Sequence, residues 1–337
     1  MRDPDEPIAV EMPKLKHWQV ALGVALGLLA GAFTVFPVRF PGDKALKVTP
    51  SLQEQQSAVP SYFKQPDSLA ELLQVPLADL GRVDIARMDL LCSEGLPGCE
   101  RTNLAQSLAM LDTWTEQVRQ ATVQHRAEFL RDPMRSHTEA QYDMMMIISV
   151  LAKGCGVHYD HDSAVAEYGL DPAQSESVTG LPSNDLGRDF FAKSDLFFLD
   201  GLLGPKRAGT CSSLPVLVTA IAQRLGYPVH MVNTFRHSFV RWDDGKERFN
   251  VETTVVSGLQ IVSDYDYRQW PRPVNDQMMA AEGYLQPLNP QQMLACFLYT
   301  RVGALLANGR LDEAKKLLPL CGVLVPTSVK YTKLPSM

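Results

Sequence analysis

The spacing of apolar residues in the first half of the chain predicts helices. From residue 69 onward, apolar side chains recur every three or four positions, as on the buried face of an amphipathic helix. Asn103 precedes the longest such run and is a residue type that caps helix N-termini, so we expect a helix at residues 104–130. A further run with three consecutive methionines predicts a helix at residues 139–151.

The second half of the chain has a mixed pattern. Residues 154–205 are rich in Gly, Asp, Ser and Pro and predict mostly irregular structure. Residues 210–225 carry an apolar helical face that ends at Gly226, and residues 229–252 contain alternating segments typical of two or three strands. After residue 287 the pattern predicts a pair of helices joined at Asn308-Gly309.

An uncharged run interrupts the N-terminal part of the chain. Residues 18–38 contain no Asp, Glu, Lys or Arg, and as a helix of about 1.5 Å per residue they would cross a bilayer core of about 30 Å. Residues 39–66 are rich in proline and polar residues and predict a linker. A cleaved signal peptide ending at Ala30-Gly31-Ala32 is the alternative.

The predicted span has two further features. Gly23, Gly27 and Gly31 lie on one helical stripe and could form a homodimer contact, although small residues are also common in membrane helices generally. Lys and Arg residues are balanced on the two sides of the span, so they do not orient it. Because short N-terminal tails usually stay in the cytoplasm, we expect a single-pass inner-membrane protein with an extracytoplasmic domain.

Composition excludes several classes of function. The chain of 337 residues has a net charge of −6 and no basic block, which argues against nucleic-acid binding. Six cysteines without a CxxC pair predict neither a disulfide scaffold nor a zinc site, although Cys92 and Cys99 could pair in an oxidising compartment. His158 and His161 have metal-like spacing but lack a third ligand, so we expect no metal and no cofactor.

Cys211 is the first candidate for chemistry. Thr210 is a suitable helix cap, and Pro215 is tolerated in a first helical turn, so Cys211 is expected at a helix N-terminus. Backbone N–H groups and the helix dipole favour a thiolate at such a position, and the same N–H groups could stabilise an oxyanion. A lone cysteine, however, is more often a buried and inert residue.

A hairpin supplies the partners. Asp244-Gly245 predicts a two-residue turn, in which facing residues have numbers that sum to 489. This register places His237 opposite Glu252, close enough for the carboxylate to reach the imidazole. A buried histidine satisfied by a carboxylate would explain this pair alone. The order of Cys, His and acid along helix and strands is also what thiol acyl transfer requires.

The same register assigns residues to the two faces of the hairpin. The apolar face is expected to contain Val240, Trp242, Phe249 and Val251, and the more polar face His237, Asn250 and Glu252. On the polar face Arg241 would oppose Arg248, so we expect both guanidinium groups to be solvated.

Residues 209–254, which begin GTCSSLPV and end FNVETT, resemble the transglutaminase-like core of bacterial proteins and are closest to its SirB-type branch. The upstream segments DLLCSEGLPG and YDHDS also resemble that branch, so the resemblance covers most of residues 80–275. It implies a papain-type fold with Cys211 as nucleophile and His237 as base. The third position of the family motif is usually Asp, and here it is Glu252.

We therefore expect an α+β protein with a transglutaminase-like, papain-like core of one helix and antiparallel strands. The expected parts are a tail (1–17), a transmembrane helix (18–38), a linker (39–66), a transglutaminase-like domain (67–285, core 205–275) and a C-terminal helical hairpin and tail (286–337). The expected function is acyl transfer on an amide of a protein or peptide substrate by a Cys211-His237-Glu252 triad. The alternative is a catalytically inactive binding or scaffold module at the membrane.

Overall fold

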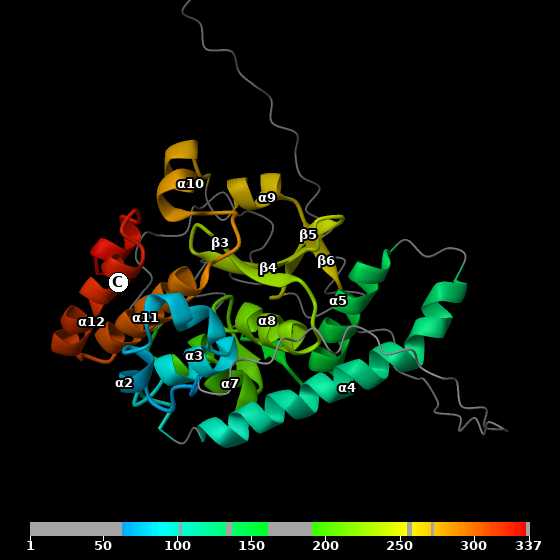
Figure 1. The fold of residues 1–337 in the computed structure, drawn as a ribbon, viewed down its shortest axis with the longest axis horizontal. Helices are drawn as coiled ribbons and strands as arrows, with labels where there is room; N and C mark the ends of the chain where they lie inside the picture. Colours follow the sequence, from blue (N-terminus) through cyan, green and yellow to red (C-terminus); the bar gives the residue numbers. More distant parts are fainter. Residues whose placement is uncertain are drawn as a thin grey trace, which may run out of the picture. The chain divides into compact units, whose positions relative to one another are not determined.

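The computed structural model describes residues 63–100, 103–132, 137–160, 191–254, 258–270 and 273–334, and these residues form the predicted α+β fold (Figure 1). The predicted membrane span, its glycine stripe and nearly all of the linker lie outside these ranges. Within them, no helix is both long enough and apolar enough to cross a membrane.

The N-terminal part is helical because its sequence supplies both caps and apolar faces. Asn103 Oδ1 accepts a hydrogen bond of 3.0 Å from Gln106 N, and Thr138 forms a capping box with Gln141. Both predicted helices are confirmed, although the second changes to a π-helical turn near its end. The elements are α2 (Leu69–Leu72), η2 (Leu77–Arg82), α3 (Ile85–Cys92), α4 (Leu104–Arg131), α5 (Glu139–Ser149) and η3 (Val150–Gly154).

Four antiparallel strands form the main sheet, in the order β3-β4-β5-β6. They are β3 (Val229–Thr234), β4 (His237–Asp243), β5 (Arg248–Glu252) and β6 (Gln260–Val262). Two short strands that precede the main sheet in the chain, β1 (His158–Tyr159) and β2 (Ala208–Gly209), pair in parallel as a separate two-stranded sheet. Residues 229–252, where two or three strands were expected, contain three, and β6 was not predicted.

The register of the β4–β5 hairpin differs from the predicted one by two residues. Asp243 pairs with Arg248, so four residues form the turn instead of two. The reason is local, because Asp244 Oδ1 accepts hydrogen bonds from the backbone N–H groups of Lys246 (2.8 Å) and Glu247 (2.7 Å) and draws them out of the ladder. A shift of two residues leaves every side chain on its predicted face.

Helix α8 (Leu214–Arg224) lies in the centre of the fold. It packs against β3 and β4 and against α3, α4, α5 and α7 (Leu199–Leu203). The predicted apolar face of the hairpin is confirmed, because its four residues belong to the same buried core as the α8 side chains. This arrangement places the start of α8 beside the start of β4.

The other face of the sheet is also covered, by α9 (Asp264–Gln269) and α10 (Asp276–Glu282), which lie across the sheet from α8 (Figure 1). Phe239, Val232 and Tyr267 form a second, smaller apolar cluster there. The face expected to be polar therefore buries aromatic side chains around its polar ones.

The predicted C-terminal helical pair is confirmed as α11 (Pro290–Ala307) and α12 (Leu311–Leu324), joined at Asn308-Gly309 and followed by η5 (Lys330–Thr332). Buried Arg301 of α11 donates to Cys92 O (2.8 Å) and Glu94 O (2.7 Å), which ties the pair to the end of α3. Cys92 and Cys99, whose pairing the sequence leaves open, are both buried free thiols.

Candidate active site

Cys211 lies in the turn at residues 209–213, here called the thiol loop, between β2 and α8. Thr210 Oγ1 accepts a hydrogen bond from Ser212 N (3.2 Å), and Ser213 Oγ accepts one from Thr210 N (3.1 Å). This reciprocal pattern resembles a capping box. The regular helix begins at Leu214 with Ser213 as its N-cap, so the predicted cap at Thr210 is three residues too early and Cys211 lies in the turn before the helix. Leu214 N still donates to Thr210 O at 3.0 Å, which joins this turn to the helix.

The thiol loop is fixed from beneath. The hydroxyls of Thr210 and Ser213 both donate to Leu196 O of η4 (Ser194–Phe197), at 3.3 and 2.7 Å. Gly209 leaves no room for a side chain, since a Cβ atom there would lie 2.5 Å from Ser213 Oγ and 2.8 Å from Leu202 Cδ2. The loop that carries the candidate nucleophile is therefore held by buried contacts on both its backbone and its hydroxyls.

His237 is positioned by a turn that the sequence did not predict. It is the first residue of β4 and pairs with Thr234, so only Phe235 and Arg236 connect β3 to β4. Arg236 has φ of +56°, a left-handed conformation that is uncommon for residues with a side chain. Strained backbone of this kind concentrates at functional sites.

His237 and Glu252 are in contact, as predicted, but along a diagonal of the hairpin. The imidazole Nε2 lies 2.7 Å from Glu252 Oε2, and both side chains are buried. In the observed register Val240 pairs with Val251, so Glu252 is two residues away from the position directly opposite His237. Diagonal neighbours are about 7–8 Å apart, within the reach of long side chains, which suits Glu better than the shorter Asp.

Glu252 is held as a carboxylate by several donors. Thr254 donates to Oε1 through its backbone N–H (2.9 Å) and its hydroxyl (2.8 Å). Burial by itself raises the pKa of Glu252, but the charge of His237 and the hydrogen bonds from His237 and Thr254 outweigh it and lower the pKa from 4.5 to about 2. The carboxylate is therefore ionised at neutral pH and able to orient His237.

Two aromatic residues near His237 were missed at the level of sequence. The Tyr267 hydroxyl, from α9, donates to Glu252 Oε2 at 3.0 Å, and the Tyr267 ring stacks on Phe239 with centroids 3.8 Å apart. Burial raises the pKa of Tyr267, so it remains a phenol and a donor. The Trp270 ring meets the His237 ring edge-on, with centroids 4.9 Å apart. No local pattern signals these contacts, because they join segments separated by many residues.

The prediction that Arg241 faces Arg248 in solvent is wrong. Arg241 is fully buried, and it donates to Asn250 Oδ1 (2.7 Å) and Leu285 O (2.8 Å) and pairs with Asp264. Arg248 is exposed and pairs with the other oxygen of Asp264 at 3.1 Å. Because Asp264 begins α9, this network attaches to the sheet the helix that presents Tyr267.

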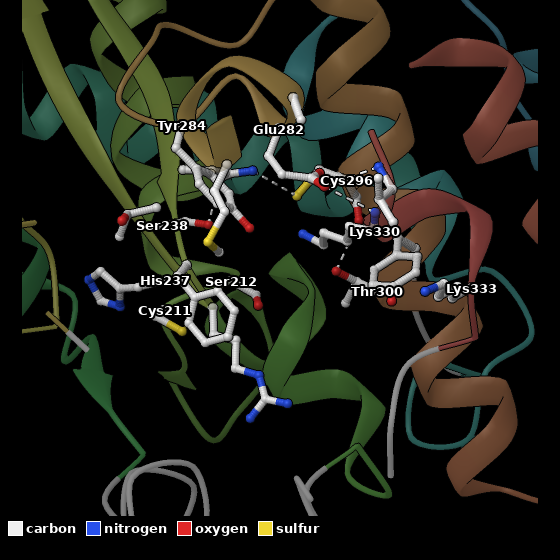
Figure 2. Close-up of a pocket in the computed structure, with 18 of the residues that line it drawn as sticks. Cys211, Ser212, His237, Ser238, Glu282, Tyr284, Cys296, Thr300, Lys330 and Lys333 are labelled. Carbon is white, nitrogen blue, oxygen red and sulfur yellow. Dashed lines mark hydrogen bonds between the residues drawn. The ribbon is translucent and has the colours of Figure 1, made fainter. Parts of the chain in front are cut away.

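A pocket of about 640 Å³ reaches Cys211 and His237. Its walls come from the thiol loop, the β3–β4 hairpin, α10, α11 and the residues around η5. Figure 2 shows Cys211 and His237 at one end of it and Lys330 and Lys333 at the other. Glu252 does not line the pocket but lies behind His237, where an orienting residue belongs. Thus Cys211 and His237, predicted as nucleophile and base, share one wall of a cavity.

Among the described residues, no group of three or more His, Cys, Asp or Glu side chains could hold a metal ion. His158 lies in β1, whereas His161 is outside the described ranges.

Comparisons with known proteins add little to this picture. No family model matches the chain, and no curated protein matches its sequence significantly. A solved structure of menin, described as revealing the binding site for Mixed Lineage Leukemia protein, is similar with 12% identity and a TM-score of 0.30. The match covers 79% of this chain and 63% of the menin chain. A TM-score of this size carries no argument about fold or function.

Proposed function

We propose that this protein is a transglutaminase-like enzyme that transfers an acyl group from an amide through Cys211. The observation that carries the proposal is the buried contact between His237 Nε2 and Glu252 Oε2, with His237 and Cys211 lining the same pocket. The order of elements also supports it: a cysteine before the central helix, a histidine beginning one strand and an acid ending the next.

Each group has a role in the proposed reaction. Glu252 accepts the Nε2–H of His237, which leaves Nδ1 as the nitrogen that takes the proton from the Cys211 thiol. The thiolate attacks the amide carbon, the C–N bond breaks, and the imidazolium returns its proton to the departing amine. Water or a second amine then attacks the thioester, giving hydrolysis or amide exchange, and the free thiol is restored.

Alkylation of Cys211 tests the proposal. Iodoacetamide labelling is followed by mass spectrometry from pH 5 to 9 in the wild type, His237→Ala and Glu252→Gln, with half-buried Cys155 as an internal reference. We expect Cys211 to react well below pH 8.5, the ordinary thiol range, and this reactivity to disappear in His237→Ala. A Cys211 profile equal to that of an ordinary thiol, and unchanged by the substitution, would overturn it.

The second candidate is an inactive binding module on the same fold. The observation in its favour is that Cys211 and His237 are only 5% and 3% exposed. In that case the pocket would hold a ligand without reaction at the thiol. A folded wild type whose Cys211 resists iodoacetamide at every pH tested would support this candidate over the enzyme.

We also propose that the domain is tethered to the inner membrane by residues 18–38, on its extracytoplasmic side. The sequence supports this proposal through the uncharged run and the Pro-rich segment that follows it.

A further inference from the structure

The end of the pocket opposite Cys211 has a positive charge. Lys330 and Lys333 line this end, and Glu282 is the carboxylate among the lining residues of the pocket. Arg236 also lines the pocket but lies beside His237 in the chain. The whole chain has a net charge of −6, so this local excess of cations is opposite to the overall balance. A concave surface with charge of one sign attracts ligands of the other sign.

The two lysines are not neutralised by other parts of the described fold. Neither Lys330 nor Lys333 has a carboxylate within ion-pair distance among the described residues. Lys330 is half-buried, and its ammonium lies 5.2 Å from the Tyr299 ring and 5.1 Å from the Tyr331 ring. These rings hold the charge in place by cation–π attraction without cancelling it.

Glu282, at the end of α10, is already used by the backbone. One carboxylate oxygen accepts hydrogen bonds from Val329 N (3.0 Å) and Lys330 N (3.1 Å), and the other accepts from the Ser328 hydroxyl. Glu282 therefore fixes the segment that carries Lys330 and positions its ammonium on the pocket wall. Its donors are backbone and hydroxyl groups, so the lysine side chains remain available to a ligand.

We infer that this end of the pocket binds a carboxylate, and that the substrate is a peptide with an acidic side chain near the amide that reacts. The inference deepens the proposed function and rests on it for the reacting amide, whereas the carboxylate site can be tested without any reaction. A volume of about 640 Å³ is in the range of small-molecule and peptide sites. Tyr284 and Tyr299 also line the pocket and supply aromatic contact area for a peptide.

Two matched peptides test the carboxylate site. Acetyl-Ala-Ala-Glu-Ala-amide and acetyl-Ala-Ala-Gln-Ala-amide differ by one charge, and their binding to the full-length Cys211→Ala protein is measured by calorimetry. We expect the Glu peptide to bind about fivefold more tightly, with a preference that weakens as salt is added. The preference should disappear in Lys330→Gln/Lys333→Gln but persist in Lys315→Gln/Lys316→Gln, which removes the same charge from exposed positions of α12. If the pocket double variant melts early, the two single variants replace it.

The same peptides with a bromoacetyl group in place of acetyl separate the two proposals in the wild type. Faster alkylation of Cys211 by the Glu probe supports both. Tighter binding of the Glu peptide without alkylation by either probe keeps the carboxylate site and overturns acyl transfer. Equal binding of the two peptides, or a preference that survives in the pocket double variant, overturns the carboxylate site whatever the thiol does.

Discussion

The Tyr267 hydroxyl donates a hydrogen bond of 3.0 Å to Glu252 Oε2, the same oxygen that lies 2.7 Å from His237 Nε2. A second donor on that oxygen stabilises the carboxylate and restricts its rotation. Because Tyr267 comes from α9, the orientation of the catalytic candidate His237 depends on a helix outside the helix-and-hairpin unit that the sequence identified.

Removing the Tyr267 hydroxyl should destabilise the fold and remove one of the hydrogen bonds that hold the Glu252 carboxylate. In Tyr267→Phe the ring that stacks on Phe239 is retained, while a hydrogen bond to a buried charge is lost. We expect the free energy of unfolding in urea to fall by about 1–2 kcal/mol. The control is Tyr265→Phe, on the exposed side of the same helix, which should leave it unchanged. Equal stabilities for the two variants would mean that the Tyr267 hydrogen bond contributes nothing.

Glu252 should make the free energy of unfolding depend on pH in the acidic range. Its pKa in the folded protein, about 2, lies below its ordinary value of 4.5, so the folded state favours the carboxylate. The stabilisation is therefore complete above about pH 4.5 and is lost as the pH falls towards 2. A shift of this size corresponds to roughly 3 kcal/mol.

The measurement compares the wild type with Glu252→Gln in urea titrations between pH 5 and pH 2.5. The difference in free energy of unfolding should be largest at pH 5 and shrink as the pH falls. Glu128→Gln on the exposed face of α4 is the matched control and should show a small, constant difference. A constant difference for Glu252→Gln as well would contradict the lowered pKa.

Gly209 is expected to tolerate no larger residue. The added methyl group of Gly209→Ala would meet Ser213 Oγ and Leu202 Cδ2 at distances that side-chain carbons do not adopt, and it would displace the cap beneath Cys211. We expect a loss of about 2–3 kcal/mol in thermal or urea unfolding, together with altered alkylation of Cys211. Gly154→Ala, where the nearest atom is 3.6 Å away, should be nearly neutral. Similar stabilities for the two variants would show that the thiol loop can adjust.

Features set by neighbouring residues were predicted well from the sequence. Asn103 caps α4 where expected, and α8 forms where its apolar face predicts it, although it begins at Leu214 instead of directly after Thr210. The pairing of His237 with Glu252 also followed from the sequence, because an error of two residues in register keeps both on one face. These results depend on caps, periodicity and strand alternation, which act over a few residues.

Features that depend on distant segments were not predicted. The four-residue turn at Asp244 is a local exception: the Asp244 carboxylate accepts hydrogen bonds from two nearby backbone N–H groups, and nothing in the sequence excludes the tighter turn. The sequence predicts a solvated side chain for Arg241, but Arg241 is buried, and its partners Asp264 and Leu285 lie outside the hairpin. The left-handed conformation of Arg236 was not predicted either, because no glycine or asparagine marks that position in the sequence.

The final prediction concerns the N-terminal segment, for which the sequence proposes a retained membrane span. The described fold begins at residue 63, so a variant lacking residues 1–60 should fold with an unchanged melting temperature and need no detergent. The full chain should stay with membranes through carbonate extraction, because residues 18–38 contain no charge. Leu28→Arg/Leu29→Arg is the control, since each arginine at the centre of a span costs about 2.5–3.5 kcal/mol and should release the chain. Sequencing of the mature N-terminus decides the rest: a chain that starts at Phe33 would show cleavage after Ala32, and the protein would then be exported without an anchor.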